Sequence, residues 1–287
     1  MTERIEPLLR RFDVRLKKSL GQNLLQDQVW LERIVAAGEV GTHDLVLEIG
    51  PGVGNLTKHL ARAARMVVAV ELDGRLLPIL NHTFAGVDNV QFVHQDILSQ
   101  DIGELARYGR SQAHGNYKVV ANIPYYITAP ILRHILESES PPNVVVVTLQ
   151  WEVARRIVAT PSDMSVLAVS VQFYGLPRIM GRIPSGAFFP RPDVDSAIVR
   201  IDVYDTPQVN VSDVSWFFRV VKAGFSQRRK QLQNALASGL GIGRDRVTAA
   251  LLNSGIDPKR RAQTLALEEW GLVQEQLSAE VHDQQDG

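Results

Sequence analysis

The sequence predicts an α/β domain followed by a small all-helical domain. In the first 205 of its 287 residues, short apolar and β-branched runs alternate with segments of helical spacing. This alternation is typical of a mostly parallel sheet covered by helices on both faces. Beyond residues 205–210 the helical spacing continues, but no convincing strand follows. We therefore expect an α/β domain over residues 1–205, a helical domain over 206–278 and a polar tail over 279–287.

Apolar runs bounded by Gly, Pro or polar residues predict the parallel strands: residues 45–49, 67–71, 90–94, 118–122 and 144–149. Helices are expected between them over residues 56–64, 76–84 and 129–136. Two later apolar runs, 166–174 and 196–203, have no obvious helix between them. We expect these two runs to close the sheet as an antiparallel, hairpin-like edge.

The helical domain is expected to contain four helices, over residues 212–224, 228–238, 244–254 and 267–277. Ser212 and Thr264 are predicted N-caps, because their side-chain oxygens can accept from the free N–H groups of a first helical turn. Gly255 is predicted to end the third helix, since glycine adopts the left-handed conformation of a helix C-terminus without strain.

Composition argues against several classes of protein. No run of about 18 apolar residues occurs, so no membrane span is expected, and the first residues lack the apolar core of a secretory signal. The chain has no cysteine, which excludes disulfides and thiolate metal ligands. From these observations we expect a cytoplasmic protein without a metal site, and we expect it to be a monomer.

The net charge is zero, with 31 basic and 31 acidic residues, but the charges are unevenly distributed. Between Trp216 and Leu265 the chain has ten Lys or Arg residues and two Asp residues, a local charge of +8 that includes Arg228, Arg229 and Lys230. A second basic cluster near the N-terminus consists of Arg10, Arg11, Arg15, Lys17 and Lys18. Clustered cations are typical of nucleic-acid contacts, although a solvated helix face would have the same composition.

A glycine-rich loop follows the first predicted strand. Residues 45–49 lead into Gly50-Pro51-Gly52-Val53-Gly54, and a helix is predicted after the loop. Glycines let the main chain turn tightly and approach a ligand, and ligands bind at the carboxyl ends of the strands in open α/β sheets. A dinucleotide-binding loop would carry its third glycine at position 55, where this chain has Asn55. The spacing therefore departs from the dinucleotide pattern.

Two carboxylates follow the next strand ends. Glu71 ends the second strand, 21 residues after Gly50, and can accept hydrogen bonds from both ribose hydroxyls of NAD or of S-adenosylmethionine. Asp96 follows the third strand and can accept from an adenine exocyclic amine. Either carboxylate alone could be a helix N-cap or a surface charge. A loop and two carboxylates on three successive strand ends suit a nucleoside that lies across the edge of the sheet.

The fourth predicted strand runs into Asn122-Ile123-Pro124-Tyr125, the most specific local feature of the chain. The side-chain oxygen of Asn122 and a main-chain carbonyl can each accept one N–H of an adenine N6 amine, which draws its delocalised lone pair towards sp³ geometry. Pro124 supplies a rigid turn that leaves its neighbour's carbonyl outside the strand ladder, and Tyr125 can stack on the base. The tetrad therefore predicts methyl transfer by positioning and preorganised dipoles, although Asn-x-Pro alone would be an ordinary turn.

The tetrad resembles the [DN]-[IL]-P-[YF] motif of amino-group methyltransferases, and the other motifs resemble the KsgA family of ribosomal RNA adenine dimethyltransferases. The matching stretches are residues 17–25 (KKSLGQNLL), 47–57 (LEIGPGVGNLT), 70–73 (VELD), 149–156 (LQWEVARR), 189–197 (FPRPDVDSA) and 225–232 (FSQRRKQL). They cover nearly the whole chain. The specificity lies in the ordered set, since each motif alone is short.

The resemblance implies a Rossmann-like class I sheet that binds S-adenosylmethionine, with the basic segment 1–26 completing the cofactor site. The cofactor residues that it implies are Gln22, Asn23, Leu25, Gly50, Gly52, Glu71, Leu72, Asp96 and Asn122. Around the target it implies Asn122, Pro124 and Tyr125 as catalytic residues, Phe188 or Phe189 beside the base that Tyr125 stacks on, and Arg228, Arg229 and Lys230 on the RNA. The family reaction places two methyl groups on each of two adjacent adenosines in the 3′-terminal hairpin loop of 16S ribosomal RNA, late in assembly of the small subunit.

Two features depart from the family's pattern. Tyr126 stands where Asn is more frequent, which bears on the shape of the target pocket. The zero net charge is lower than is usual in the family, which bears on non-specific affinity for RNA and not on the chemistry.

Three alternatives remain at this point. Large-subunit (23S) adenine methyltransferases share the cofactor site, but residues 189–192 and 228–230 favour the small-subunit group. A non-catalytic RNA-binding assembly or transcription factor on the same scaffold would be marked by the loss of Asn122, Glu71 or the glycines, all of which are present. A nicotinamide-dependent oxidoreductase is disfavoured by Asn55 and by the turn that follows Asn122.

Overall fold

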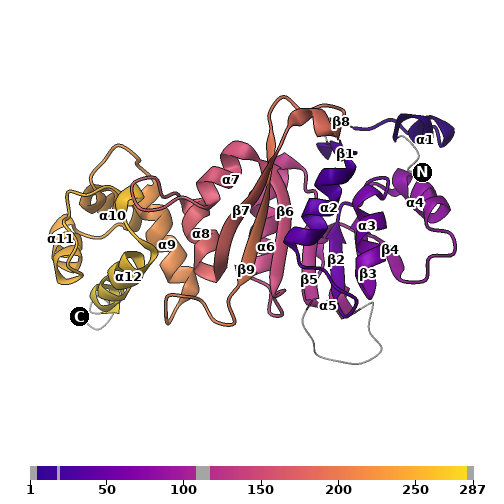
Figure 1. Cartoon of the computed structure of the whole chain (residues 1–287). Coiled ribbons are helices and arrows are strands. Elements are labelled where there is room, and N and C mark those ends of the chain that lie inside the picture. Colours follow the sequence, from indigo (N-terminus) through magenta and orange to yellow (C-terminus); the bar gives the residue numbers. More distant parts are fainter. Residues whose placement is uncertain (1–4, 18–19, 108–116, 283–287) are drawn as a thin grey trace. The chain divides into compact units, whose positions relative to one another are not determined.

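The computed structural model describes residues 5–17, 20–107 and 117–282, and Figure 1 shows its ribbon. The chain forms two compact units. The first contains Met1–Ala154 and Leu176–Asp205, and the second contains Arg155–Gly175 and Thr206–Gly287. The expected boundary at residue 205 does separate the units. Residues 155–175, however, belong with the helical unit and not with the α/β unit, in which we expected them.

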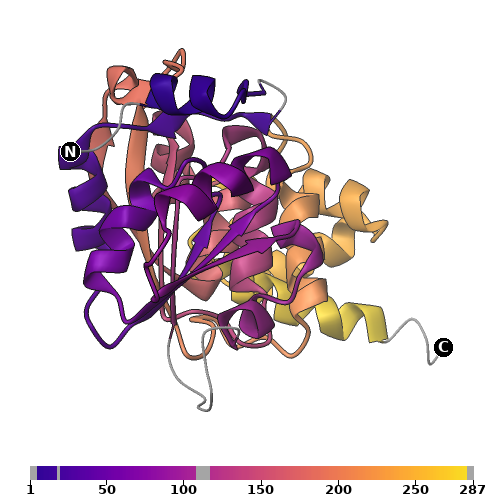
Figure 2. The ribbon, with the colours of Figure 1, turned by 90° about the vertical axis from the view of Figure 1, so that its right-hand side faces the viewer.

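A seven-stranded sheet forms the centre of the first unit, in the order β4-β3-β2-β5-β6-β9-β7. The parallel strands are β2 (Leu45–Ile49), β3 (Met66–Glu71), β4 (Val90–His94), β5 (Tyr117–Ala121) and β6 (Val144–Gln150). β9 (Ser196–Val203) runs antiparallel to β6, and β7 (Gly175–Ile183) follows it at the edge. Figure 2 shows the twist of this sheet. The strand order reverses between β2 and β5, and such a switch point is where ligands bind in open α/β sheets.

The sheet forms because its central strands are apolar and are covered by helices. Every residue of β2 is buried, and so are the first six residues of β6. α2 (Gln28–Ala37) and α3 (Asn55–Ala63) share a core cluster with strand residues such as Val46, Val120 and Val146, so both helices pack against the same face. This unit also contains α4 (Leu77–Thr83), α5 (Ile102–Arg107), α6 (Thr128–Leu136) and the start of α7 (Trp151–Ile157).

The N-terminal segment packs beside the glycine-rich loop. α1 (Ile5–Arg11) buries Leu8 and Leu9 in a cluster that also contains Leu24, Val53 and Ile79. Further along, β1 (Leu24–Leu25) forms a two-stranded antiparallel sheet with β8 (Phe188–Phe189). Pairing with β8 joins the segment to a distant part of the same unit. Lys18, one of the expected basic residues, lies outside the described residues.

The prediction of a strand over residues 166–174 is wrong, because this run forms the helix α8 (Val166–Tyr174). Ser165 caps the helix by accepting a hydrogen bond from the Ala168 N–H. An apolar run of nine residues fits either a buried strand or a buried helix, so its periodicity does not decide between them. Phe173 is fully buried in the core of the helical unit, which stabilises the helix. The edge strand of the sheet is instead β7, the next segment of the chain.

The helical unit also contains α9 (Val214–Phe225), α10 (Leu232–Leu240), α11 (Arg244–Asn253) and α12 (Leu267–His282). Their core includes Phe217 and Trp270, both fully buried. Gly255 follows α11 with φ of +71°, as predicted for a helix stop. The two N-cap predictions are wrong.

Asp213 caps α9 by accepting from the Trp216 N–H at 3.0 Å, so the neighbouring Ser212 has no capping role there. Thr264 lies in the short 3₁₀ turn η6 (Ala262–Thr264), three residues before α12 begins. Its hydroxyl donates to the Arg261 carbonyl oxygen. The expected caps therefore fail by one residue for α9 and by two residues for α12.

Candidate active site

A cleft opens at the carboxyl ends of β2, β3, β4 and β5, around the switch point of the sheet. The space between its lining residues is about 810 Å³, and this volume includes space that is open to solvent. The predicted site residues that line it are Gln22, Asn23, Gly50, Gly52, Glu71, Leu72, Asp96, Asn122, Pro124 and Tyr125. Residues more than 100 positions apart in the sequence are thus brought to one edge of the sheet.

The glycine-rich loop brings main chain, rather than side chains, to the cleft. Gly50 and Gly52 have φ of +70° and +61°, which other residues rarely adopt. A Cβ on Gly52 would lie 2.5 Å from Leu24 Cδ2, whereas a Cβ on Gly50 would meet nothing within 4 Å. Asn55 begins α3, and its side-chain Nδ2 donates to the Leu25 carbonyl oxygen at 2.8 Å. The residue that breaks the dinucleotide pattern therefore joins the loop to β1.

Glu71 presents a buried carboxylate at the end of β3. Its Oε2 accepts from the Gly52 N–H at 3.1 Å and its Oε1 accepts from the Asp73 N–H at 2.8 Å. Burial raises the pKa of Glu71 above its ordinary value, and the two main-chain donors oppose that rise. Each carboxylate oxygen can accept a second hydrogen bond, so the pair can still receive two ribose hydroxyls.

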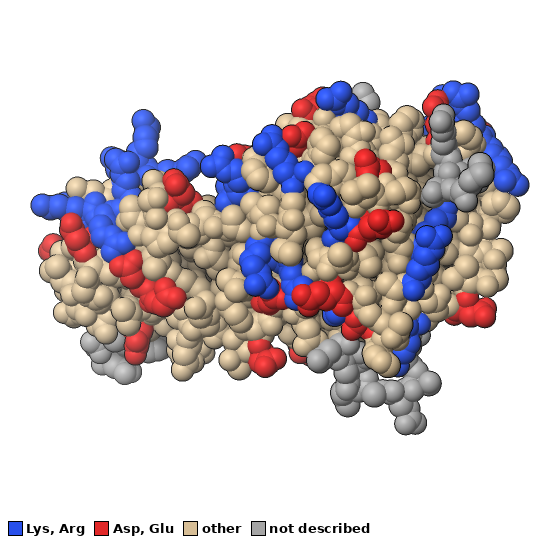
Figure 3. All heavy atoms as spheres, in the orientation of Figure 1, with Lys and Arg blue, Asp and Glu red and all other residues tan. Residues whose placement is uncertain are grey.

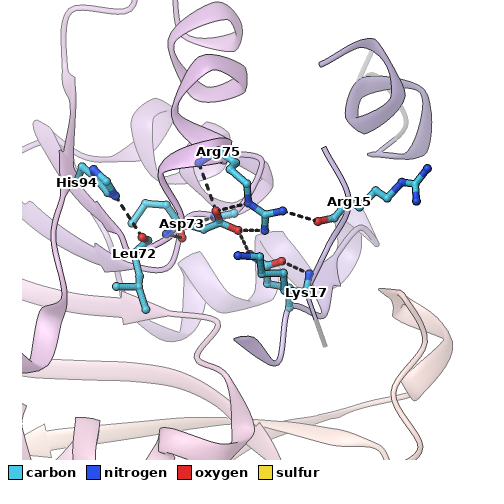
Figure 4. A network of polar contacts seen from close by, with 9 residues as sticks. Arg15, Lys17, Leu72, Asp73, Arg75 and His94 are labelled. Carbon is cyan, nitrogen blue, oxygen red and sulfur yellow. Dashed lines mark hydrogen bonds and ion pairs between the residues drawn. The ribbon is translucent and has the colours of Figure 1, made fainter. Parts of the chain in front are cut away.

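Gln22 is held at both ends of its amide by Lys17 and Asp73, two residues that Figure 4 labels. Its Nε2 donates to Asp73 Oδ2 at 2.9 Å, and its Oε1 accepts from the Lys17 N–H at 2.7 Å. Arg75 forms an ion pair with Asp73 and donates to the Arg15 carbonyl oxygen at 3.1 Å. The Arg75 guanidinium lowers the pKa of Asp73 to about 2. This network, which we call the Asp73 clasp, fastens the N-terminal segment beside the cleft.

Asp96 follows β4 at the rim of the cleft, next to Gln95. It caps the short 3₁₀ turn η3 (Ile97–Ser99), because its Oδ1 accepts from the Leu98 N–H at 3.0 Å. Its side chain is exposed. A carboxylate that caps one N–H retains acceptor capacity, so Asp96 can also accept from an exocyclic amine.

Asn122 and Tyr125 are both held in fixed orientations. Asn122 Nδ2 donates to the Asn23 carbonyl oxygen at 2.9 Å, and Asn122 Oδ1 accepts from the Thr148 hydroxyl. Tyr125 begins the 3₁₀ turn η4 (Tyr125–Ile127) and forms a 2.6 Å hydrogen bond between its hydroxyl and Ser196 Oγ. Burial raises the pKa of the Tyr125 hydroxyl, so this group is neutral near pH 7. The tetrad therefore presents an oriented amide beside an anchored aromatic ring.

Three predicted residues do not line the cleft. Leu25 is 3% exposed and lies in the core, while the neighbouring Leu24 lines the cleft in its place. Phe188 is 2% exposed in the same core cluster, so its ring is not available to a base in this structure. Phe189 packs with Leu24 and Val53 in the cluster beside α1. In the antiparallel pairing of β1 with β8, Leu25 lies opposite the buried Phe188, and Leu24 lies opposite Phe189, which is only partly buried.

The sequence predicted a helix at Arg228, Arg229 and Lys230, and this prediction is wrong. The three residues are exposed in the turn between α9 and α10, because α10 begins only at Leu232. Figure 3 shows Lys and Arg side chains gathered on the part of the helical unit where α10 and α11 lie. Successive side chains of a helix point in directions about 100° apart. In a turn, adjacent cations are not bound to this spacing.

The cleft also contains residues that the sequence analysis did not assign. Tyr126, noted only as a departure from the family's pattern, is 57% exposed at the rim. Gln95, which directly precedes Asp96, also lines the cleft, and no motif in the sequence marks it. Thr148 and Ser196 lie on β6 and β9, and only their position in the sheet shows that they reach the tetrad. Among the described residues, no cluster of His, Asp and Glu suits a metal ion, and no helix is long and apolar enough to span a membrane.

Comparison with known proteins adds an independent result. A family model described as "Ribosomal RNA adenine dimethylase" matches residues 14–278. Ribosomal RNA small subunit methyltransferase A of Dehalococcoides mccartyi (strain CBDB1) is 45% identical over 264 residues, which are 92% of this chain and 89% of the relative. The protein of the same name from Bacillus pumilus (strain SAFR-032) is 42% identical over 272 residues, 93% of either chain.

Two solved structures share the architecture. The 23S rRNA methyltransferase ErmE has a TM-score of 0.69 and 28% identity, over 89% of this chain and all of that one. A dimethyladenosine transferase from Plasmodium falciparum has a TM-score of 0.72 and 20% identity, over 90% of this chain and 98% of that one. The second likeness supports the fold alone.

Proposed function

Because the chain belongs to the ribosomal RNA adenine dimethylase family, we propose that it methylates the N6 amines of two adjacent adenosines in the 3′-terminal hairpin loop of small-subunit (16S) ribosomal RNA. S-adenosylmethionine is the methyl donor, and each adenosine receives two methyl groups. The observation that carries the proposal is the oriented amide of Asn122 at the end of β5, in the same cleft as Tyr125 and Glu71.

The cleft fits S-adenosylmethionine on three observations. Glu71 is a buried carboxylate whose oxygens can each accept one more hydrogen bond, as two ribose hydroxyls require. Gly50 leaves open space where a side chain would stand, so a ligand can lie against the main chain. Apolar residues such as Ile97 and Val70 also line the cleft and suit the flat face of an adenine. When bound, the cofactor supplies a methyl group on a positively charged sulfur.

The protein's own groups have to aim the target nitrogen, because an adenine N6 amine is a poor nucleophile. Asn122 Oδ1 accepts one N–H of the amine, and a main-chain carbonyl of the tetrad accepts the other. Tyr125 stacks on the base, and its link to Ser196 keeps the ring in place. Holding the reactants in line in a preorganised polar site is sufficient for a transfer of this kind, without a titrating base in the methyl-transfer step.

The first test is Asn122→Ala. Cofactor affinity should stay within a few fold of the parent, because Glu71 and the loop are unchanged, whereas methyl transfer should fall by at least about 100-fold. The measurement is incorporation of labelled methyl groups into unmethylated small subunits, followed by mapping of dimethyladenosine in the RNA. A variant that methylates at the parental rate would remove Asn122 from the mechanism.

A second candidate substrate is the large-subunit (23S) RNA, since ErmE is a 23S rRNA methyltransferase by its title. The identity to ErmE is 28%, against 45% to the small-subunit methyltransferase of Dehalococcoides mccartyi, so we favour the small subunit. Unmethylated small and large subunits offered in the same assay distinguish the two. Label found only in 23S RNA would refute the small-subunit proposal and leave the methyltransferase chemistry intact.

The proposed partner is the small ribosomal subunit itself, late in its assembly, with Arg228, Arg229 and Lys230 on the RNA. We further propose that the protein acts as a monomer in the cytoplasm, where the subunit is assembled. The lack of any metal in the proposed reaction is tested by adding a chelator selective for transition metals, which leaves the Mg²⁺ bound to the RNA in place and should leave the methylation rate unchanged.

A further inference from the structure

Thr148 lies directly behind the proposed catalytic amide. It sits on β6, which pairs in parallel with β5, and the register Ala121↔Val147 brings Thr148 beside Asn122. The residue is fully buried, and its hydroxyl donates to Asn122 Oδ1. On the other side of the amide, Asn122 Nδ2 donates to the Asn23 carbonyl oxygen.

The two contacts select one orientation of the amide. The Asn23 carbonyl oxygen can only accept, so it requires the amide nitrogen on its side. If the amide were rotated by 180°, Asn122 Oδ1 would face this carbonyl, and two acceptors would be left without a donor between them. The Thr148 hydroxyl completes the arrangement because it can donate to Oδ1. After both contacts are made, Oδ1 retains one lone pair for a substrate N–H.

The surrounding strand shows that packing alone does not require a hydroxyl at this position. Thr148 interrupts a fully apolar stretch, with four valines before it and Leu149 after it. A buried hydroxyl is unfavourable unless it has a partner, and valine has the same shape and a higher preference for buried strands. The partner of this hydroxyl is the oxygen that the mechanism uses.

We propose that Thr148 is a positioning residue that holds Asn122 Oδ1 as the acceptor for the target amine. This inference rests on the proposed function, because Asn122 must act on the amine for its orientation to matter. Thr148 does not touch the substrate. It acts by keeping the amide in the reactive orientation and by restricting its rotation, which lowers the reorganisation needed when the base arrives.

The test compares Thr148→Val with Thr148→Ser in the full-length chain. Valine keeps the shape and removes the hydroxyl, so kcat should fall by about ten- to a hundredfold, while KM for the cofactor and for the small subunit stay at the parental values. Serine keeps the hydroxyl and loses a methyl group, so its kcat should return to near the parental value. A purely structural role would predict the reverse order, because serine leaves a small cavity and valine does not.

A double variant separates this inference from the proposed function. If Thr148 acts through Asn122, adding Thr148→Val to Asn122→Ala should cause no further loss of rate. Parental activity of Asn122→Ala would overturn the proposed function and this inference with it. An inactive Asn122→Ala beside a Thr148→Val with parental kcat would overturn the inference alone. A kcat reduced equally by valine and serine would also overturn it, since the hydroxyl would then not be the cause.

Discussion

The negative charge of Glu71 favours hydrogen bonds from ribose hydroxyls, but burial of the side chain makes this charge unfavourable. The residue is 6% exposed, and burial raises its pKa in spite of two main-chain donors. Ribose hydroxyls donate most strongly to the ionised carboxylate, so the form that binds the cofactor is the one that burial penalises. Cofactor affinity should therefore depend on the pH at which this one group loses its proton.

The expected result is a loss of cofactor affinity as the pH falls, with a midpoint above the 4.5 of an ordinary glutamate. Glu71→Gln should weaken binding by at least about tenfold, because hydrogen bonds to a charged acceptor are worth about 1.5–3 kcal/mol and one amide N–H would face a main-chain donor. Calorimetric titration with the cofactor across a pH series measures both. A profile of the variant with the same pH midpoint as the parent would assign the titration to another group.

At the level of elements, the N-terminal segment depends on the Asp73 clasp for its position. The Asp73 side chain is 5% exposed while that of Arg75 is 38% exposed, so the clasp lies at the edge of the buried region. The folded pKa of Asp73, about 2, lies below the ordinary 3.8. Its contribution to stability is therefore complete above pH 3.8 and is lost only as the pH falls through about 2. Near neutral pH the clasp is insensitive to pH.

Asp73→Asn should loosen the segment around Gln22, because the variant loses the ion pair with Arg75 and one acceptor oxygen. Faster amide hydrogen exchange near Gln22, with parental exchange in β6, is the expected result. Glu137→Gln is a matched control, since it removes the carboxylate of an exposed ion pair with Arg133 on α6. The same increase near Gln22 in the control would show that the effect is not specific to the clasp.

Some of the helices and strands could be predicted from the sequence, and others could not. The strand residues 45–49 and 196–203 agree with β2 and β9 to the residue, because each is an apolar run with clear ends. α8 could not be told from a strand, since its stability comes from a core formed with distant helices. The pairing of β1 with β8, which buries Leu25 and Phe188, also joins segments far apart in the chain. Local motifs therefore identified the residues that line the cleft better than residues such as Leu25 and Phe188, whose burial depends on the pairing of distant segments.

For the molecule as a whole, the net charge is zero, but the basic and acidic residues are unevenly distributed along the chain. The segment from Trp216 to Leu265 has a local charge of +8, and an excess of acidic residues in the rest of the chain cancels it. Non-specific RNA affinity depends on the cations that reach phosphates and not on the total. A protein of zero net charge can therefore bind RNA through clustered cations without binding it elsewhere.

The turn at 228–230 provides the test of this view. Replacing Arg228, Arg229 and Lys230 by Gln should weaken RNA binding and reduce the slope of log affinity against log salt by up to about two to three, since each phosphate contact contributes about 0.7–0.9. Binding of a hairpin RNA measured across a salt series gives the slope directly. Replacing the exposed Arg62, Arg65 and Arg133 of the α/β unit by Gln removes the same charge elsewhere. If both triple variants lower the slope equally, net charge and not the turn governs binding; a loss confined to the first variant places the phosphate contacts on the helical unit.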